Sequence, residues 1–132
     1  MSRANDKGNE AELYVQKHYE AQGYTVHRAR ASRQKIGIKT ITVSHDIWGC
    51  FDLLCKKPDE IIYVQVACGS KKADKEKKIL AVDIWGSQDR IEIWLSMGDG
   101  EWKIYRHNGQ KKFIEVAGIL RGGKYYELRE AA

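Results

Sequence analysis

Two short strands around a turn carry an acid and an amide that could bind a metal ion together. The first strand is Phe51–Leu54, the turn is Lys57–Glu60, and the second strand is Tyr63–Ala67. Pairing about the centre of the turn places Asp52 opposite Gln65, with Cβ atoms about 4.5–5.5 Å apart. Carboxylate and amide oxygens both coordinate divalent cations. The hairpin is therefore predicted to supply half of a metal site.

Alternation along these strands separates apolar residues from the acid and the amide. Asp52, Gln65 and Ala67 are expected on one face of the hairpin. The candidate ligands would then lie on one side of a sheet whose other side covers an apolar core. That apolar face is predicted to contain Phe51, Leu53, Cys55, Ile62, Val64 and Val66.

A second acid, Glu12, belongs to a predicted N-terminal helix. Asp6 is expected to cap this helix, which runs to about Gln22 and is stopped by Gly23. Glu12 would then stand in the first or second turn. The approximate apolar stripe of the helix consists of Ala11, Leu13, Val15 and Tyr19.

Glu12, Asp52 and Gln65 together offer the ligands that Mg²⁺ prefers. The ion takes oxygen ligands in octahedral geometry, with few from protein and several from water and phosphate, and Mn²⁺ could substitute for it. Such an ion polarises a phosphate oxygen, activates a water and stabilises the leaving oxygen. Beside basic clusters, the expected substrate is a nucleic-acid phosphodiester.

Basic residues flank the candidate site in the sequence. The net charge is only +5, from 23 Lys and Arg against 18 Asp and Glu, and a mild excess is weak support for nucleic acid by itself. The distribution says more, because no acid occurs from His27 to Lys39. The two clusters consist of Arg28, Arg30, Arg33, Lys35 and Lys39, and of Lys71, Lys72, Lys75, Lys77 and Lys78.

The elements that must position these residues alternate between helix and strand. The N-terminal helix and strand are followed by a basic, polar segment, 31–45, that is expected to be a loop with a short strand at 39–43. The order predicts an α/β fold with a central mixed sheet and helices packed on it. After the 6–22 helix, the expected elements are strands at 24–30, 50–56 and 61–67, a helix at 71–85, and strands at 90–96, 102–106 and 113–116.

The bulk numbers suit one cytoplasmic domain that spans 1–132. With 132 residues, of which 42% are hydrophobic, the chain can bury a core. It has neither an apolar run near 18 residues nor a signal peptide, so no membrane partner is expected. Three cysteines, an odd count, argue against a disulfide framework.

Five segments in this order resemble a known enzyme family. They are Lys7–Glu12, Gly23-Tyr24, Arg28–Ser32, Phe51–Leu54 and Val64–Ala67. Together they resemble the archaeal-type Holliday junction resolvases of the PD-(D/E)xK nuclease superfamily, and related phage-encoded enzymes. The resemblance covers roughly residues 7–70, about half the chain, and the ordered combination is more specific than any single segment.

The resemblance implies a restriction-endonuclease-like fold and a role for each matching residue. Glu12 and Asp52 match metal-binding acids, and Gln65 stands where the family usually has a second hairpin acid. Ser32 matches a catalytic serine, and Ala67 stands where the catalytic lysine belongs. The residues implied in DNA binding are Arg3, Lys7, Arg28, Arg30, Arg33, Lys35, Lys71 and Lys72.

Two departures from the family pattern bear on activity. Gln65 is neutral and should weaken metal binding, although its amide oxygen still coordinates. Ala67 lacks the ammonium that would orient water and offset phosphate charge, a role worth about 3–4 kcal/mol per lost group in other enzymes. Three explanations stay open: an introduced Lys→Ala change, a basic group supplied from elsewhere such as Lys71 or Lys72, and a naturally inactive relative.

The function implied is a Mg²⁺-dependent DNA endonuclease that resolves four-way junctions by paired nicks. Cutting two symmetric strands implies a two-fold homodimer, in the host cytoplasm if the chain is phage-encoded. With Ala67 in place, the chain is expected to bind junctions and cleave them poorly. The alternatives are another restriction or repair nuclease of this superfamily, and a non-catalytic DNA-binding module on the same fold.

Overall fold

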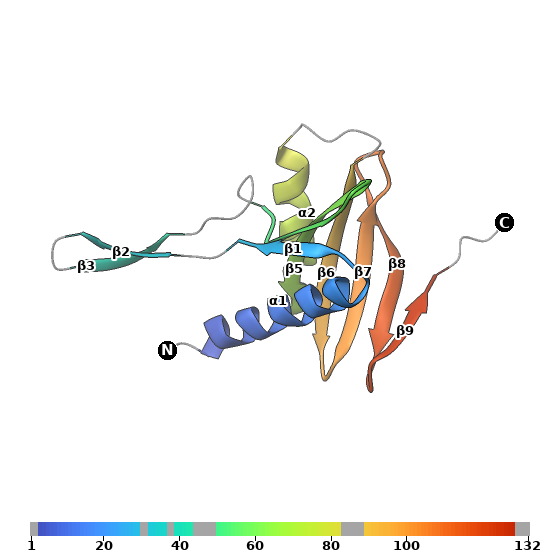
Figure 1. Cartoon of the computed structure of the whole chain (residues 1–132), viewed down its shortest axis with the longest axis horizontal. Helices are drawn as coiled ribbons and strands as arrows, with labels where there is room; N and C mark the ends of the chain where they lie inside the picture. Colours follow the sequence, from blue (N-terminus) through green and yellow to red (C-terminus); the bar gives the residue numbers. More distant parts are fainter. Residues whose placement is uncertain (1–2, 30–31, 37–38, 44–49, 83–88, 129–132) are drawn as a thin grey trace.

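A computed structural model describes residues 3–29, 32–36, 39–43, 50–82 and 89–128. It is an α/β structure in which two helices flank a seven-stranded mixed sheet (Figure 1). The elements are α1 (Arg3–Ala21), β1 (Thr25–Arg28), β2 (Ser32–Ile36), β3 (Lys39–Val43), β4 (Leu53–Lys57), β5 (Glu60–Cys68), the 3₁₀ turn η1 (Gly69–Lys71), α2 (Lys72–Ala81), β6 (Arg90–Gly98), β7 (Glu101–His107), β8 (Phe113–Leu120) and β9 (Lys124–Glu127).

The main sheet has the strand order β1-β4-β5-β6-β7-β8-β9. Its pairs are antiparallel except β5 and β6, which run parallel and are connected through α2. A parallel pair requires such a crossover, because its strands begin at the same end of the sheet. The central position of β5 and β6 explains why both are buried on two faces.

Each face of the sheet carries its own apolar cluster under one helix. On the α1 face, Val15 and Tyr19 pack against Leu53 and Val64, with Trp94 and Trp102 farther along the sheet. On the α2 face, a smaller cluster surrounds the buried Ile79; its buried members are Cys50, Phe51, Ala67, Ile79, Ile91, Ile93 and Leu95. Side chains of β5 alternate between the clusters, as the sequence predicts.

The N-terminal helix follows the expected stripe only in part. Ala11, Val15 and Tyr19 recur every four residues and face the sheet, whereas Leu13 is 39% exposed. Leu13 lies two residues from Val15 and so on a different side of the helix. The helix begins at Arg3, before the predicted cap, and the chain leaves it at Gly23, whose φ of +92° suits glycine.

The basic segment expected as a loop forms a hairpin instead. β2 pairs antiparallel with β3 over five residue pairs, from Ser32 opposite Val43 to Ile36 opposite Lys39. This two-stranded sheet is separate from the main one and projects away from it between β1 and β4 (Figure 1). The short strand predicted at 39–43 is thereby confirmed as β3. We refer to β2 and β3 as the basic arm.

The C-terminal part also contains more strand than expected. β8 extends to Leu120, and a turn through Gly122 and Gly123, both at positive φ, leads into β9 at the edge of the sheet. α2 ends at Ala81, because its C-cap residue Val82 has an extended backbone (φ −88°, ψ 93°), so the helix is shorter than the predicted one that reached residue 85. Residues 83–88 lie outside the described residues. Among the described residues, no helix has the length and apolar composition needed to cross a lipid bilayer.

Candidate functional site

The structure brings Asp52 and Gln65 into direct contact. The β4–β5 ladder pairs Leu53 with Val64, which is the register predicted from the turn. Asp52 lies just before β4, and its Oδ2 accepts hydrogen bonds from Gln65 Nε2 at 2.9 Å and from the Val66 amide at 3.0 Å. The predicted pairing of acid and amide across the hairpin is therefore confirmed.

The amide of Gln65 presents its nitrogen, not its oxygen, to Asp52. Gln65 is 3% exposed, and Nε2 also donates to the Val66 carbonyl at 3.0 Å. An amide oxygen is the atom that would coordinate a hard cation. Gln65 would therefore have to turn its amide over, and give up both donated hydrogen bonds, before it joined Asp52 in binding a metal.

Phe51 does not lie on the predicted face. It packs in the α2-face cluster with its ring 5.5 Å from that of Tyr63, whereas Leu53 and Cys55 face α1. The strict alternation fails at Asp52, a bend outside the regular β4 ladder. The interpretation that Phe51 shares a face with Leu53 is wrong, because it assumed a continuous strand through residue 52.

Glu12 lies beside Arg28, at the end of the β1–β4 pair that is next to Asp52. Glu12 Oε1 is 3.7 Å from Arg28 Nε, and both side chains are mostly buried, at 20% and 13% exposure. Arg28 stands opposite Leu53, and the Ala29 amide donates to the Asp52 carbonyl at 2.8 Å. The Glu12–Arg28 pair is thus one backbone step away from Asp52.

Two of the three predicted metal ligands, Glu12 and Gln65, start from different faces of the sheet. Glu12 comes from α1, while Gln65 lies between Tyr63 and Ala67, which both pack on the α2 face. Among the described residues, no three His, Cys, Asp or Glu side chains gather closely enough to hold an ion. Two carboxylates and an amide suit Mg²⁺ chemically, so the ligand set stays a prediction.

Ala67 is buried beneath α2. It is 3% exposed and packs in the cluster that contains Ile79 and Leu95. A lysine at this position would have to thread its methylene stem past that packing and bring its ammonium out at the edge, as long amphipathic side chains do. The position expected to carry the catalytic lysine is therefore closed in this chain.

The predicted DNA-binding residues and the candidate catalytic Ser32 lie in several parts of the structure. Arg28 is engaged with Glu12, and Lys72 is held by Glu76 Oε1 at 2.7 Å, with its ammonium 4.3 Å from the Tyr105 ring centroid. Lys71 is exposed in η1. Ser32, Arg33 and Lys35 stand on β2 of the basic arm, Arg3 and Lys7 stand on the first two turns of α1, and Arg30 lies outside the described residues.

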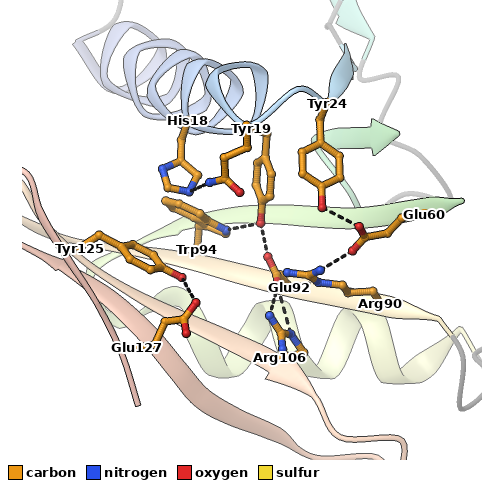
Figure 2. Close-up of polar contacts among 11 residues, drawn as sticks. His18, Tyr19, Tyr24, Glu60, Arg90, Glu92, Trp94, Arg106, Tyr125 and Glu127 are labelled. Carbon is orange, nitrogen blue, oxygen red and sulfur yellow. Dashed lines mark hydrogen bonds and ion pairs between the residues drawn. The ribbon is translucent and has the colours of Figure 1, made fainter. Parts of the chain in front are cut away.

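Sequence reasoning missed a buried ionic network between α1 and the sheet (Figure 2). Glu92, on β6, is 1% exposed, and its Oε2 accepts from Arg106 at 2.9 and 3.1 Å and from Arg90 at 3.2 Å. Its Oε1 accepts from the Tyr19 hydroxyl. Arg90 also donates to Glu60, and Glu60 accepts a second hydrogen bond from the Tyr24 hydroxyl at 2.7 Å.

Burial and this network alter the acidity of its members. Burial, followed by the charge of Glu92, raises the pKa of Tyr19 well above its usual value, so this hydroxyl stays protonated and able to donate. The hydrogen bond from Tyr24 is the main influence that lowers the pKa of Glu60, and Arg90 adds to it. The network thus supplies hydrogen-bond donors to two carboxylates, those of Glu60 and Glu92.

A signal for Glu92 was present in the sequence. The alternation of apolar residues with Glu92 and Trp94 predicts a strand with one wet face, but a parallel central strand is buried on both faces. An acid in such a strand needs donors, and Arg90 and Arg106 are close to it in the sheet.

Comparison with protein families, with curated proteins and with solved structures finds no match for this chain.

Proposed function

We propose that this chain is a nuclease of the PD-(D/E)xK type with a restriction-endonuclease-like fold, which binds branched DNA and cleaves it poorly. The single observation that carries the proposal is the Asp52–Gln65 contact at 2.9 Å, in the register that places Ala67 two residues farther along β5. Glu12 lies beside Arg28, one backbone step from Asp52, which supports a site at this end of the sheet.

In this proposal Glu12, Asp52 and Gln65 would hold Mg²⁺ or Mn²⁺. The ion would supply positive charge against the phosphodiester and lower the pKa of water. Glu12 and Asp52 supply the negative charge that attracts the ion, while Gln65 contributes a neutral amide. Arg28 would balance Glu12 and lie close to the phosphate, and Ser32, which begins β2 of the basic arm, would be the candidate catalytic serine.

The DNA would be held mainly by its backbone. The arm and the adjacent segment contain no acid from His27 to Lys39, and Arg33 and Lys35 stand on β2. Positive groups of this kind contact phosphates and read the shape of a duplex more than its bases. A two-fold homodimer would present two such arms and two sites to a four-way junction. We propose the cytoplasm, that of the host for a phage-encoded chain, as its compartment.

A second function is favoured by two observations on the same hairpin. Gln65 turns its amide nitrogen toward Asp52, and Ala67 is closed off under α2. Both would suit a non-catalytic module that binds branched DNA without a metal ion. The two functions share the DNA-binding surface and differ in metal binding and in cleavage.

Cleavage of four-way junctions by the native chain and by Ala67→Lys tests the proposal. With Mg²⁺ the native chain is expected to bind the junction and leave it intact, and Ala67→Lys is expected to cleave at least about 10²-fold faster, because it restores an electrostatic group. Forked, nicked and plain duplex DNA, measured in parallel, identify the preferred substrate. Strand products are quantified on denaturing gels.

Two control variants separate charge from packing in this test. Ala67→Met has nearly the length of lysine without its charge and is expected to stay inactive. Asp52→Asn combined with Ala67→Lys should lose the activity that Ala67→Lys gains. Full cleavage by the native chain would refute the argument about Ala67, and no gain by Ala67→Lys would favour the non-catalytic module.

A further inference from the structure

Tyr19 ties the N-terminal helix to a buried carboxylate in the middle of the sheet. Its hydroxyl donates to Glu92 Oε1, and Trp94 Nε1 donates to the Tyr19 oxygen at 3.2 Å. Tyr19 is 3% exposed and Glu92 1%, so bulk water has little access to this contact. Figure 2 shows the hydroxyl between the indole of Trp94 and the carboxylate of Glu92.

The two oxygens of Glu92 receive their donors from different elements. Oε2 accepts from Arg90 on β6 and Arg106 on β7, whereas Oε1 accepts from Tyr19 on α1. A buried carboxylate oxygen that loses its donor is penalised by its desolvation. A slide or rotation of α1 would withdraw the hydroxyl from Oε1, so the contact selects one position of the helix on the sheet.

Tyr19 and Glu12 share one face of α1. They are seven residues apart, which is about two helical turns and about 10 Å along the axis. Val15, which is fully buried, lies between them and packs on the same face of the sheet. Because the helix is rigid, a contact that fixes α1 at Tyr19 also fixes the position of Glu12. Glu12 Oε1 lies 3.7 Å from Arg28 Nε.

From this geometry we infer that Tyr19 is a positioning residue, which acts through Glu92 to set where Glu12 stands relative to Asp52. The inference rests on the proposed function in that it gives Glu12 a place in the metal site. Tyr19 itself lies in the core and takes no part in binding the ion or the DNA. Its hydroxyl fixes the register between α1 and the sheet.

The chain offers a matched control in Tyr24. Its hydroxyl donates to Glu60 Oε2 at 2.7 Å within the same network, but Tyr24 follows α1 and Glu60 is about one-third exposed. Tyr24→Phe removes the same atom as Tyr19→Phe without releasing the helix. If the network served stability alone, both substitutions would lower the melting temperature and leave the position of Glu12 unchanged.

The first experiment measures the position of α1 without a metal. Nitroxide labels on native Cys68, which is exposed, and on Glu10→Cys, at an exposed helix position, report the distance from α1 to the end of β5. Cys50 and Cys55 are buried and remain unlabelled. Tyr19→Phe is expected to shift or broaden the distance distribution by pulsed EPR, and Tyr24→Phe to leave it unchanged. An unchanged distribution in Tyr19→Phe would overturn the inference.

The second experiment measures Mn²⁺ affinity by EPR, at a temperature where every variant is folded. Tyr19→Phe is expected to bind Mn²⁺ about tenfold more weakly than the native chain, as for residues that orient metal ligands, and Tyr24→Phe as tightly as the native chain. A shifted helix with native affinity would refute the link to Glu12. Absence of Mn²⁺ binding in all variants would contradict the proposed function, while the distances still decide whether Tyr19 positions α1.

Glu92→Gln is a second variant, which tests the inference if Tyr19→Phe does not fold. Glutamine can turn its single amide oxygen toward Arg90 and Arg106 and donate its amide N–H to the Tyr19 oxygen, so a hydrogen bond between α1 and β6 persists while the charge is lost. The distance distribution is then expected to stay as narrow as in the native chain. A broadened distribution in Glu92→Gln would show that the arginine pairs hold the helix and would overturn the role of the Tyr19 hydroxyl.

Discussion

At the scale of single residues, protein contacts already hold both Asp52 and Ala67 in the β4–β5 hairpin. Asp52 is fixed by donors from Gln65 and the Val66 amide, so one carboxylate oxygen is already satisfied by protein. Ala67 is buried and is covered by α2. These contacts stabilise the hairpin without a metal ion and make metal binding compete with an existing hydrogen bond.

Gln65→Glu should make the stability of the chain depend on a divalent ion. The substitution removes the donor to Asp52 and puts a second carboxylate where Nε2 now lies 2.9 Å from Oδ2. Without metal at pH 7 we expect a loss of about 1–3 kcal/mol in the free energy of unfolding. Saturating Mn²⁺ should reverse that loss, because it neutralises the pair.

Thermal unfolding with EDTA and with Mn²⁺ measures this effect. Gln110→Glu adds the same charge at an exposed turn position and serves as the control. Its melting temperature should respond to Mn²⁺ no more than that of the native chain. If Gln65→Glu responds no more than Gln110→Glu, the hairpin does not bind the ion.

At the scale of elements, the hairpin register was predictable because turn and strands specify it together. Leu53 pairs with Val64 as expected, since a slip by one residue would move every apolar side chain of the hairpin to the wrong face. The geometry of the candidate metal ligands was less predictable. Phe51 leaves the alternation at a bend, and no pattern along α1 reports that Glu12 comes from the face opposite Gln65.

Of the basic arm only β3 was predicted, and β2 was missed because its polar, basic residues do not show the alternation that marks a half-buried strand. β9 was missed for a related reason, since an edge strand of four residues after two glycines carries little pattern. The burial of Glu92 was not predicted, for the opposite reason. Its strand alternates, but the parallel pairing of β5 with β6 and the cover of α1 bury both faces.

The arm should contribute to DNA affinity through its charge. Arg33→Gln with Lys35→Gln removes two positive groups from β2 and is expected to weaken binding to junctions and duplexes alike. The slope of log K against log salt should fall by about 1 for each lost phosphate contact. Fluorescence anisotropy across a salt series measures both quantities.

Lys77→Gln with Lys78→Gln is the matched control for the arm. These exposed lysines on α2 carry the same charge, and we expect their loss to change the salt slope less than loss of the arm charges. Equal slopes for the two double variants would indicate a diffuse electrostatic attraction and contradict a specific role for the arm.

At the scale of the whole molecule, aromatic residues connect the first helix to the last strand. His18 of α1 lies 4.8 Å from the Trp94 ring and 5.8 Å from the Tyr125 ring on β9, measured between ring centroids. Burial lowers the pKa of His18, and Glu92 opposes this to a smaller extent. The neutral ring is therefore part of the packing that holds the N-terminal helix, the central strand and the C-terminal strand together.

This packing should make folding stability depend on pH. A histidine in the unfolded chain titrates near pH 6.5, whereas folded His18 takes up its proton only at lower pH. At pH values between the folded pKa and about 6.5, the unfolded state binds more protons than the folded state. The free energy of unfolding therefore has its full value above about pH 6.5 and falls as the pH drops through the folded pKa. His107, whose pKa burial also lowers, acts in the same direction.

Urea unfolding at pH 7.5, 6.5 and 5.5 measures this dependence. The slope of the free energy of unfolding against pH reports proton uptake, whereas lost packing lowers the free energy at every pH. His18→Gln should lower stability at every pH and flatten the decline, because glutamine cannot take up the proton. His27→Gln removes an exposed histidine on β1 and should retain the native slope. A native slope in His18→Gln would mean that other groups, His107 first among them, carry the pH dependence and that the contact between α1 and β9 does not.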